Sequence, residues 1–251
     1  MLTLLHDGTF TGRLCAVARA LELDQPIQLA VVSDERTGSL LDVEELVVSD
    51  ETRAGVLLAD ATRRISGVAR RHIFHVMYAE RKALDAFLGE YLRLGFRMGA
   101  KVDSCNTQSG VRELLAASQR VAAEINRLKC LLRFSRLASG VCWAPVAPLA
   151  NVILPVAFHF RRRFGAERWG IQDVQRGLAM FWDGRELTAH AGPEYEAVLT
   201  QWCPAELAPD EREYRDLWRT FFRSSAIPPR CNPGLPHANM PRYYWKYLTG
   251  L

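Results

Sequence analysis

The sequence predicts an α+β fold in which an N-terminal helical layer packs on a small, mostly antiparallel sheet. Apolar residues recur at helical spacing through most of the first 130 residues. Near residue 130 the pattern changes to short apolar runs separated by turn residues, which is typical of strands. Helices followed by a group of strands, without regular alternation, favour α+β over a parallel α/β sheet.

The chain should begin with a strand and a helix. The apolar run at 2–5 ends in the turn His6-Asp7-Gly8, and Thr9 is a suitable N-cap for the helix that follows. Residues 22–50 are acidic and irregular, so we expect a connecting segment there with one short strand at 29–32.

Helices should dominate as far as residue 130. A helical stretch is expected from the start signal Ser49-Asp50-Glu51 to about residue 99, with a break near Ser66-Gly67. A further helix is expected from Val111 to Leu128, where the apolar residues keep helical spacing throughout.

Beyond residue 130 the sequence predicts the sheet. The expected strands are 131–134, 141–146, 169–174 and 178–182. Asn151 is a suitable cap for a helix inserted between the second and third of these strands.

A last helix is expected from about Pro209 to Arg223, and the proline-rich tail after it should be mostly extended. We therefore expect a single domain. It comprises a mainly helical part (1–130), a strand-rich part (131–208) and a C-terminal helix with its tail (209–251).

The composition bounds the class of protein. The 251 residues are 49% apolar and 24% charged, which is ordinary for a globular protein and excludes a disordered or fibrous chain. No run of about 18 uncharged apolar residues is present, so no membrane span is expected. The N-terminus lacks the basic and apolar regions of a signal peptide, so we expect a cytoplasmic protein.

No cofactor is expected. The six cysteines are dispersed, without the close pairs that zinc and cluster sites use. The P-loop, the dinucleotide fingerprint and the nucleophile elbow are missing. We therefore expect neither a metal nor an organic cofactor.

The net charge is +4, and 28 of the 32 basic residues are arginine because the sequence has only four lysines. Two explanations remain open. A GC-rich genome favours arginine codons without any functional meaning, whereas arginine is also the better group for phosphate and base contacts.

The segment from Glu124 to Arg133 carries the first site residues. Glu124 and Arg127 are three residues apart and could pair on one helix face. One interpretation is a solvated helix end, and the other is a basic ridge of Arg127, Lys129 and Arg133 that faces phosphate.

A second segment holds His159, at the flank of an apolar stripe, followed by three arginines at 161–163. His159 is either a hydrogen-bonded structural residue or a catalyst. Cations suit a helix C-terminus, and Arg163 lies close to the stripe, so we expect it to have a partner.

Asp173 is the most suggestive carboxylate. Strand alternation places it on the same face as Trp169 and Ile171. A carboxylate among large apolar residues needs an arginine or several N–H donors. We expect Asp173 to be buried and bonded to Arg163 or Arg176, and the alternative is a general base.

The tail combines aromatic and basic residues, which could stack on bases and hold phosphates or could instead seal a core. Together the segments give one set of possible nucleic-acid contacts. These are Arg127, Arg133, Arg161, Arg162, Arg176, Arg230, Asn232, Arg242, Tyr243, Trp245 and Lys246.

Several motifs occur together in a fixed order. They are Leu5-His6-Asp7-Gly8-Thr9-Phe10, the segments Glu124–Phe134, Asn151–Arg163 and Trp169–Gly184, and the tail Arg230-x-Asn232-Pro233-x-Leu235 with Met240–Leu248. In these motifs the chain resembles, nearly end to end, a bacterial family of unknown function that is catalogued under DNA metabolism and DNA repair. The resemblance implies a radical SAM protein as the partner, because members are usually encoded beside one. Many members are fused to a C-terminal uracil-DNA glycosylase domain, and this chain is expected to be a stand-alone member.

Two positions depart from the family pattern. A histidine usually stands where this chain has Asn126, and another usually stands at Gln172. If those histidines perform acid–base chemistry, this member has lost it. If they only form hydrogen bonds, Asn and Gln are reasonable replacements.

Three functions follow as hypotheses. The first is an accessory protein that binds DNA, with unpaired DNA expected, for a radical SAM partner that modifies or repairs a base. The second is a metal-independent enzyme acting on nucleic acid, in which Asp173, His159 and Glu124 converge in one pocket. The third is a structural subunit of the partner without nucleic-acid contact. Whether the chain is an enzyme stays undecided, although the sequence lacks a recognised catalytic motif.

Overall fold

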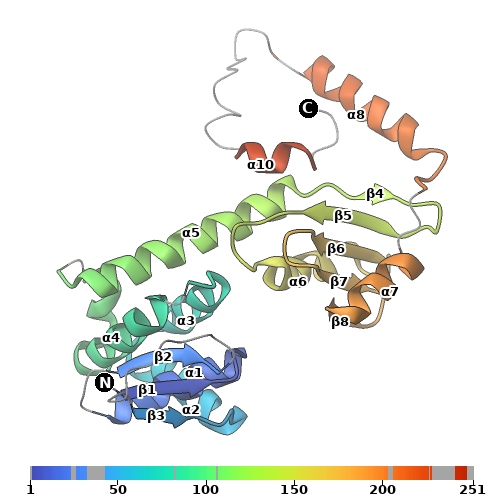
Figure 1. Cartoon of the computed structure of the whole chain (residues 1–251). Coiled ribbons are helices and arrows are strands. Elements are labelled where there is room, and N and C mark those ends of the chain that lie inside the picture. Colours follow the sequence, from blue (N-terminus) through green and yellow to red (C-terminus); the bar gives the residue numbers. More distant parts are fainter. Residues whose placement is uncertain are drawn as a thin grey trace. The chain divides into compact units, whose positions relative to one another are not determined.

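A computed structural model describes most of the chain (Figure 1). The described residues are 2–23, 27–32, 43–81, 83–105, 107–202, 206–225, 227 and 241–247. The chain folds into two compact units, Met1–Ala122 and Ala123–Leu251. The boundary falls within the long helix α5 (Ser109–Leu131).

The N-terminal unit is built on a three-stranded parallel sheet. The strand order is β2 (Ile27–Val31), β1 (Leu2–His6), β3 (Val43–Leu46), with β1 in the centre. Helix α1 (Phe10–Glu22) connects β1 to β2, since parallel neighbours need a crossover connection. Thr9 caps this helix as predicted, and its side chain accepts the N–H of Gly12.

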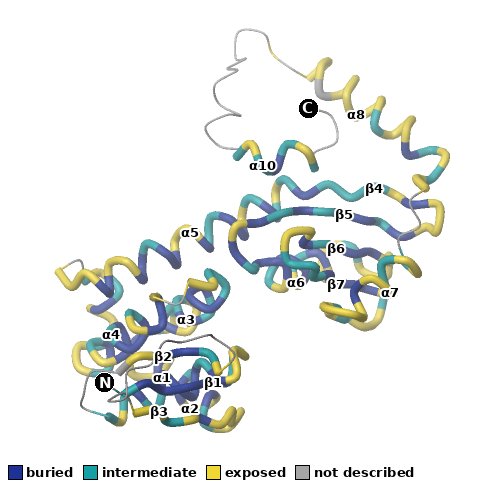
Figure 2. The backbone as a smooth tube through the Cα atoms, viewed as in Figure 1, coloured by how far each residue is buried: buried dark blue, intermediate teal, exposed yellow. Residues whose placement is uncertain are grey.

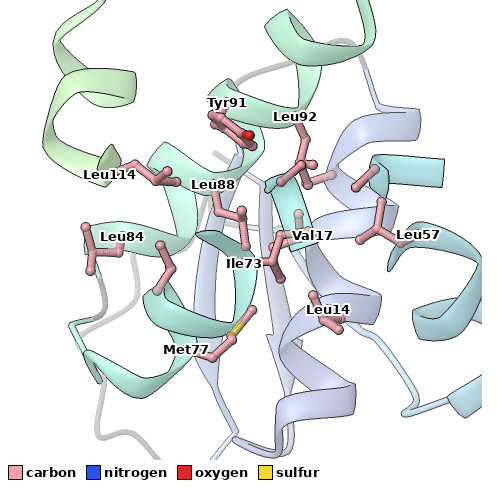
Figure 3. Packing of buried hydrophobic residues seen from close by; sticks show 14 of the residues in the cluster. Leu14, Val17, Leu57, Ile73, Met77, Leu84, Leu88, Tyr91, Leu92 and Leu114 are labelled. Carbon is pink, nitrogen blue, oxygen red and sulfur yellow. The ribbon is translucent and has the colours of Figure 1, made fainter. Parts of the chain in front are cut away.

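Helices α1 and α4 contact the strands of this sheet, and further helices pack against these two. The remaining helices of the unit are α2 (Glu51–Arg64), α3 (Ala69–Tyr78), α4 (Ala83–Met98), the 3-10 helix η1 (Gly99–Ser104) and the first part of α5. Figure 3 shows side chains of α1, such as Leu14 and Val17, buried in one cluster with Ile73 of α3 and Leu88 of α4. The predicted break near Ser66-Gly67 separates α2 from α3, as expected.

The C-terminal unit is built on a five-stranded sheet. Its strands lie in sequence order: β4 (Ser135–Arg136), β5 (Cys142–Val146), β6 (Trp169–Asp173), β7 (Leu178–Trp182) and β8 (Leu187–Ala191). Figure 2 shows β5, β6 and β7 as mostly buried. Helix α6 (Ile153–Phe164) contacts β6 and β7, and α7 (Pro193–Trp202) contacts β8. The last described helices are α8 (Glu211–Ser225) and α10 (Arg242–Trp245).

The α+β class is confirmed. The expectation of one small, mostly antiparallel sheet is wrong, because the described residues form two sheets in which three strand pairings are parallel and three are antiparallel. The first sheet is parallel throughout, and β5 and β6 of the second sheet are also parallel. The inserted helix α6 explains why β5 and β6 are parallel, because it carries the chain back to the end of the sheet at which β5 begins. The N-terminal helices contact the parallel sheet of their own unit.

Several element boundaries also differ from the predictions. The strand predicted at 131–134 is absent from this part of the structure, because α5 continues to Leu131 and the short β4 follows. Asn151 is not the cap of α6, whose N-cap residue is Val152. In the tail, Arg242–Trp245 is helical and not extended. No helix among the described residues is long and apolar enough to cross a membrane.

Candidate nucleic-acid interface

Helix α6 has one buried side and one exposed side. Its buried residues, Ile153, Val156, Ala157 and Phe160, pack under the sheet at helical spacing. The opposite side presents Leu154, Phe158 and Arg161, which lie at i, i+4 and i+7. Leu154 is 37% exposed and Phe158 is 44% exposed. A large aromatic ring is therefore open to solvent on a well-packed helix.

Arg161 lies between two aromatic rings. Its guanidinium carbon is 5.8 Å from the ring centre of Phe158 and 5.7 Å from that of Trp182. Trp182 is buried, and its indole Nε1 donates a hydrogen bond of 2.7 Å to the carbonyl oxygen of Gly165. The Trp182 ring is thus fixed, and the two cation–π contacts hold Arg161 beside the exposed ring of Phe158.

The arginines of α6 lack acidic partners in the part of the chain that the structure describes. There, no ion pair joins Arg161, Arg162 or Arg163 to a carboxylate. By contrast, Arg53 and Arg219 each pair with a carboxylate. The helix C-terminus offsets part of the repulsion among three adjacent cations, because its carbonyl groups carry partial negative charge. The remaining positive charge faces solvent.

His159 responds to this positive charge. Partial desolvation lowers the pKa of His159, and the positive charges of Lys129, Arg163 and Arg162 lower it further. The imidazole packs edge-on against Phe160, with ring centres 5.0 Å apart. These shifts favour the neutral form of His159, whose partly exposed ring lies at the border of a basic surface.

Glu124, on α5, is buried, so the solvated interpretation of this position is wrong. It is 4% exposed and accepts hydrogen bonds from the backbone N–H groups of Leu149 (2.7 Å) and Ala150 (3.0 Å). The hydroxyl of Tyr244 donates a third hydrogen bond, of 2.8 Å. The expected ion pair with Arg127 is not among the contacts of the described residues. Glu124 instead joins α5, the loop before α6 and α10.

The prediction that Asp173 is buried and bonded to an arginine is confirmed. Asp173 is 0% exposed, and its Oδ2 accepts a hydrogen bond of 2.9 Å from Arg176. Its Oδ1 accepts the backbone N–H groups of Gln175 and Arg176. The other predicted partner, Arg163, is exposed.

Glu124 and Asp173 belong to one polar network. The guanidinium of Arg176 also donates to the carbonyl oxygens of Pro148 and Leu149, at 2.9 Å each. Leu149 donates its own N–H to Glu124, which closes the chain of contacts. The structure therefore brings two of the three predicted catalytic residues into one network, and no hydrogen bond within the described residues links His159 to either. Arg176 uses its guanidinium within the protein.

The tail residues lie near the C-terminal part of α5. Tyr244 is buried against Glu124, whereas Arg242 and Lys246 are exposed and Tyr243 and Trp245 are partly buried. Burial raises the pKa of Tyr243, and the hydrogen bond with Tyr244 opposes this shift. The charge of Glu124 raises the pKa further, whereas the charge of Arg127 lowers it. Arg127 is therefore near Tyr243, and we call Arg127, Arg242, Tyr243 and Lys246 the second surface. Arg230 and Asn232 lie outside the described residues.

Three other predicted positions are placed as follows. Arg133 donates to the carbonyl oxygens of Cys130 and Leu132, and its guanidinium lies 5.7 Å from the ring centre of Trp218. Asn126 is exposed on α5. The amide of Gln172 donates a hydrogen bond to the hydroxyl of Tyr195. Gln172 therefore has a hydrogen-bonding role in this chain.

Comparison with known families identifies the chain. Residues 82–250 match the family described as a domain of unknown function, DUF4130. The chain belongs to this family. No curated protein and no solved structure matches it. The surface of α6, the network of Glu124 and Asp173, and the tail all lie within the DUF4130 match.

Sequence reasoning on this DUF4130 member misses Phe158. Charge alone draws attention to Arg161 and Arg162, and it gives Phe158 no role. A signal is present in the sequence: Phe158 is offset from Val156 and Phe160, and it shares its face with Leu154 and Arg161. Only the structure shows that the Phe158 ring is exposed on this face.

Proposed function

We propose that the chain is an accessory DNA-binding protein that holds unpaired DNA for a radical SAM protein acting on that DNA. The observation that carries the proposal is the outer face of α6. Arg161 lies beside the exposed ring of Phe158, and Arg162 and Arg163 follow it along the helix. None of the three pairs with a carboxylate of the described residues. Arginine contacts to phosphate, together with aromatic rings, are the usual means of binding single strands.

The second surface supports the same function. Arg127 is close enough to Tyr243 for its charge to lower the pKa of that side chain, and Arg242 and Lys246 are exposed in the same tail segment. The carboxylate of Glu124 is buried and occupied by three hydrogen bonds. The radical SAM partner is proposed from the resemblance of the sequence to a family encoded beside such a protein.

The enzymatic alternative is less well supported. Asp173 is fully buried, and both of its oxygens accept hydrogen bonds from the protein. Glu124 is also buried, and both of its carboxylate oxygens accept hydrogen bonds from backbone N–H groups. A general base must reach the proton that it removes, and both carboxylates are enclosed by protein groups.

The DNA-binding proposal is tested by fluorescence anisotropy with a labelled single-stranded oligonucleotide at several salt concentrations. Each arginine that contacts a phosphate should contribute about −0.7 to the slope of log affinity against log salt. Arg162→Ala and Arg163→Ala should therefore each weaken binding and flatten this slope. The matched control is Arg219→Ala, which removes an exposed arginine that already pairs with Asp216.

If the α6 variants bind with parent-like affinity and an unchanged salt slope, the arginines of α6 do not contact the DNA. Absence of binding by the parent protein would refute DNA binding and favour the structural-subunit hypothesis. The partner is tested separately, by sedimentation of the purified radical SAM protein mixed with this chain. Independent sedimentation of the two proteins would refute that part of the proposal.

A further inference from the structure

Phe158 is exposed in a setting that suits a planar ligand. The ring projects from the outward side of α6, and Leu154 extends the apolar surface by one turn of the same face. The neighbouring buried side chains of α6 hold the helix in place. The exposed ring is therefore presented by a rigid element.

The polar groups around the ring are donors and cations. Arg161 lies 5.8 Å from the centre of the Phe158 ring, and Arg162 donates from its Nε to the carbonyl oxygen of Phe158 at 3.4 Å. The terminal nitrogens of Arg162 have no hydrogen-bond partner within the described residues. Helix α6 itself carries no acidic residue. A planar apolar ring with a cationic border fits a ligand with a flat aromatic part and a negative charge nearby.

We propose that the exposed face of Phe158 is the stacking site for one unpaired nucleobase, with Arg162 contacting the adjoining phosphate. This inference rests on the proposed function and adds the group that is recognised. Duplex DNA presents its bases already stacked and paired, so a base must leave the stack before it can reach Phe158. The site therefore selects single strands or displaced bases over intact duplex. Because every base has a π-face, it tolerates all four bases.

The test compares two labelled oligonucleotides of equal length, one of thymidines and one with abasic residues on the same phosphate backbone. Phe158→Ala should weaken binding of the thymidine strand by about 5- to 140-fold, which corresponds to about 1–3 kcal/mol. Phe158→Tyr should bind like the parent, because it keeps an aromatic face. The matched control is Phe221→Ala on α8, which removes a phenylalanine that is 61% exposed. Because both residues lie on the surface, each variant should fold, and circular dichroism checks this.

The abasic strand identifies the base as the ligand. The parent should bind it more weakly than the thymidine strand, whereas Phe158→Ala should bind both strands alike. The same comparison with an RNA strand of uridines shows whether the sugar affects affinity. A loss of affinity in Phe158→Ala for either nucleic acid supports the stacking site.

The inference and the proposed function fail in different ways. If the parent binds DNA but Phe158→Ala binds both strands as the parent does, stacking on Phe158 is refuted and DNA binding stands. Equal losses of affinity in Phe158→Ala and Phe221→Ala would also refute stacking on Phe158, because the loss would not be specific to α6. If the parent binds none of the strands, the proposed function fails with it.

Discussion

The hydrogen bond between Tyr244 and Glu124 offers a direct test of how the tail is anchored. The hydroxyl of Tyr244 donates to Oε1 of Glu124 at 2.8 Å, and Tyr244 is buried. Tyr244→Phe keeps the buried ring and removes only this bond. A hydrogen bond to a charged group contributes about 1.5–3 kcal/mol. Oε1 keeps its hydrogen bond from Leu149, so we expect a loss of about 2 kcal/mol in the free energy of unfolding.

Glu124→Gln should cost more than Tyr244→Phe. The carboxylate accepts three hydrogen bonds, and an amide nitrogen in place of one oxygen would face an N–H donor. We expect a loss of about 3 kcal/mol, because a buried donor is then left unsatisfied. In the double variant the two losses should not be additive, since both variants change the hydrogen bonds of the same side chain.

The assay is chemical denaturation, combined with hydrogen exchange of peptides that cover 147–151 and 241–247. Tyr244→Phe should accelerate exchange in the tail, and Glu124→Gln should accelerate it in both segments. Tyr214→Phe on α8 is the matched control, because its hydroxyl is lost from an exposed ring and should change stability by less than about 0.5 kcal/mol. Parent-like stability and exchange in Tyr244→Phe would show that this hydrogen bond does not anchor the tail.

Two further predictions concern a buried and a half-buried polar group, Asp173 and His72. Asp173→Asn should destabilise the protein by about 3 kcal/mol, because Arg176 loses its ionic partner in a largely buried site, and a parent-like melting temperature would contradict this. Burial lowers the pKa of His72, the charge of Asp103 opposes this shift, and the charge of Arg71 adds to it. The unfolded chain therefore takes up a proton at higher pH than the folded chain, so stability should fall as the pH drops below about 6.5 toward the lower pKa of the folded state. Denaturation at pH 7.5 and 5.5 should show a smaller pH effect in His72→Asn than in the parent, and equal effects would exclude His72 as the source.

Local sequence signals determined much of the secondary structure. Thr9 caps α1 and Asp50 caps α2, and both signals act through side-chain bonds to backbone N–H groups within three residues. The β6–β7 hairpin follows from apolar runs separated by a short turn. The burial of Asp173 followed from alternation, because side chains two apart on a strand share a face.

The arrangement of the strands depended on contacts between distant residues. Strand β3 has the sequence Val-Glu-Glu-Leu and is mostly exposed, so its composition gives no strand signal. It is a strand because its backbone pairs with β1, about forty residues earlier in the chain. The parallel pairing of β5 with β6 likewise depends on where α6 packs, which a pattern of apolar residues does not specify.

The candidate site shows the same division between local and distant causes. The sequence identified the arginines of α6, because a run of charge is visible without any structure. It could not show that Phe158 is exposed or that Glu124 is buried. The partners of Glu124 lie 25, 26 and 120 residues away. Burial of a side chain is decided by which distant segments pack over it, and a local pattern carries no information about those segments.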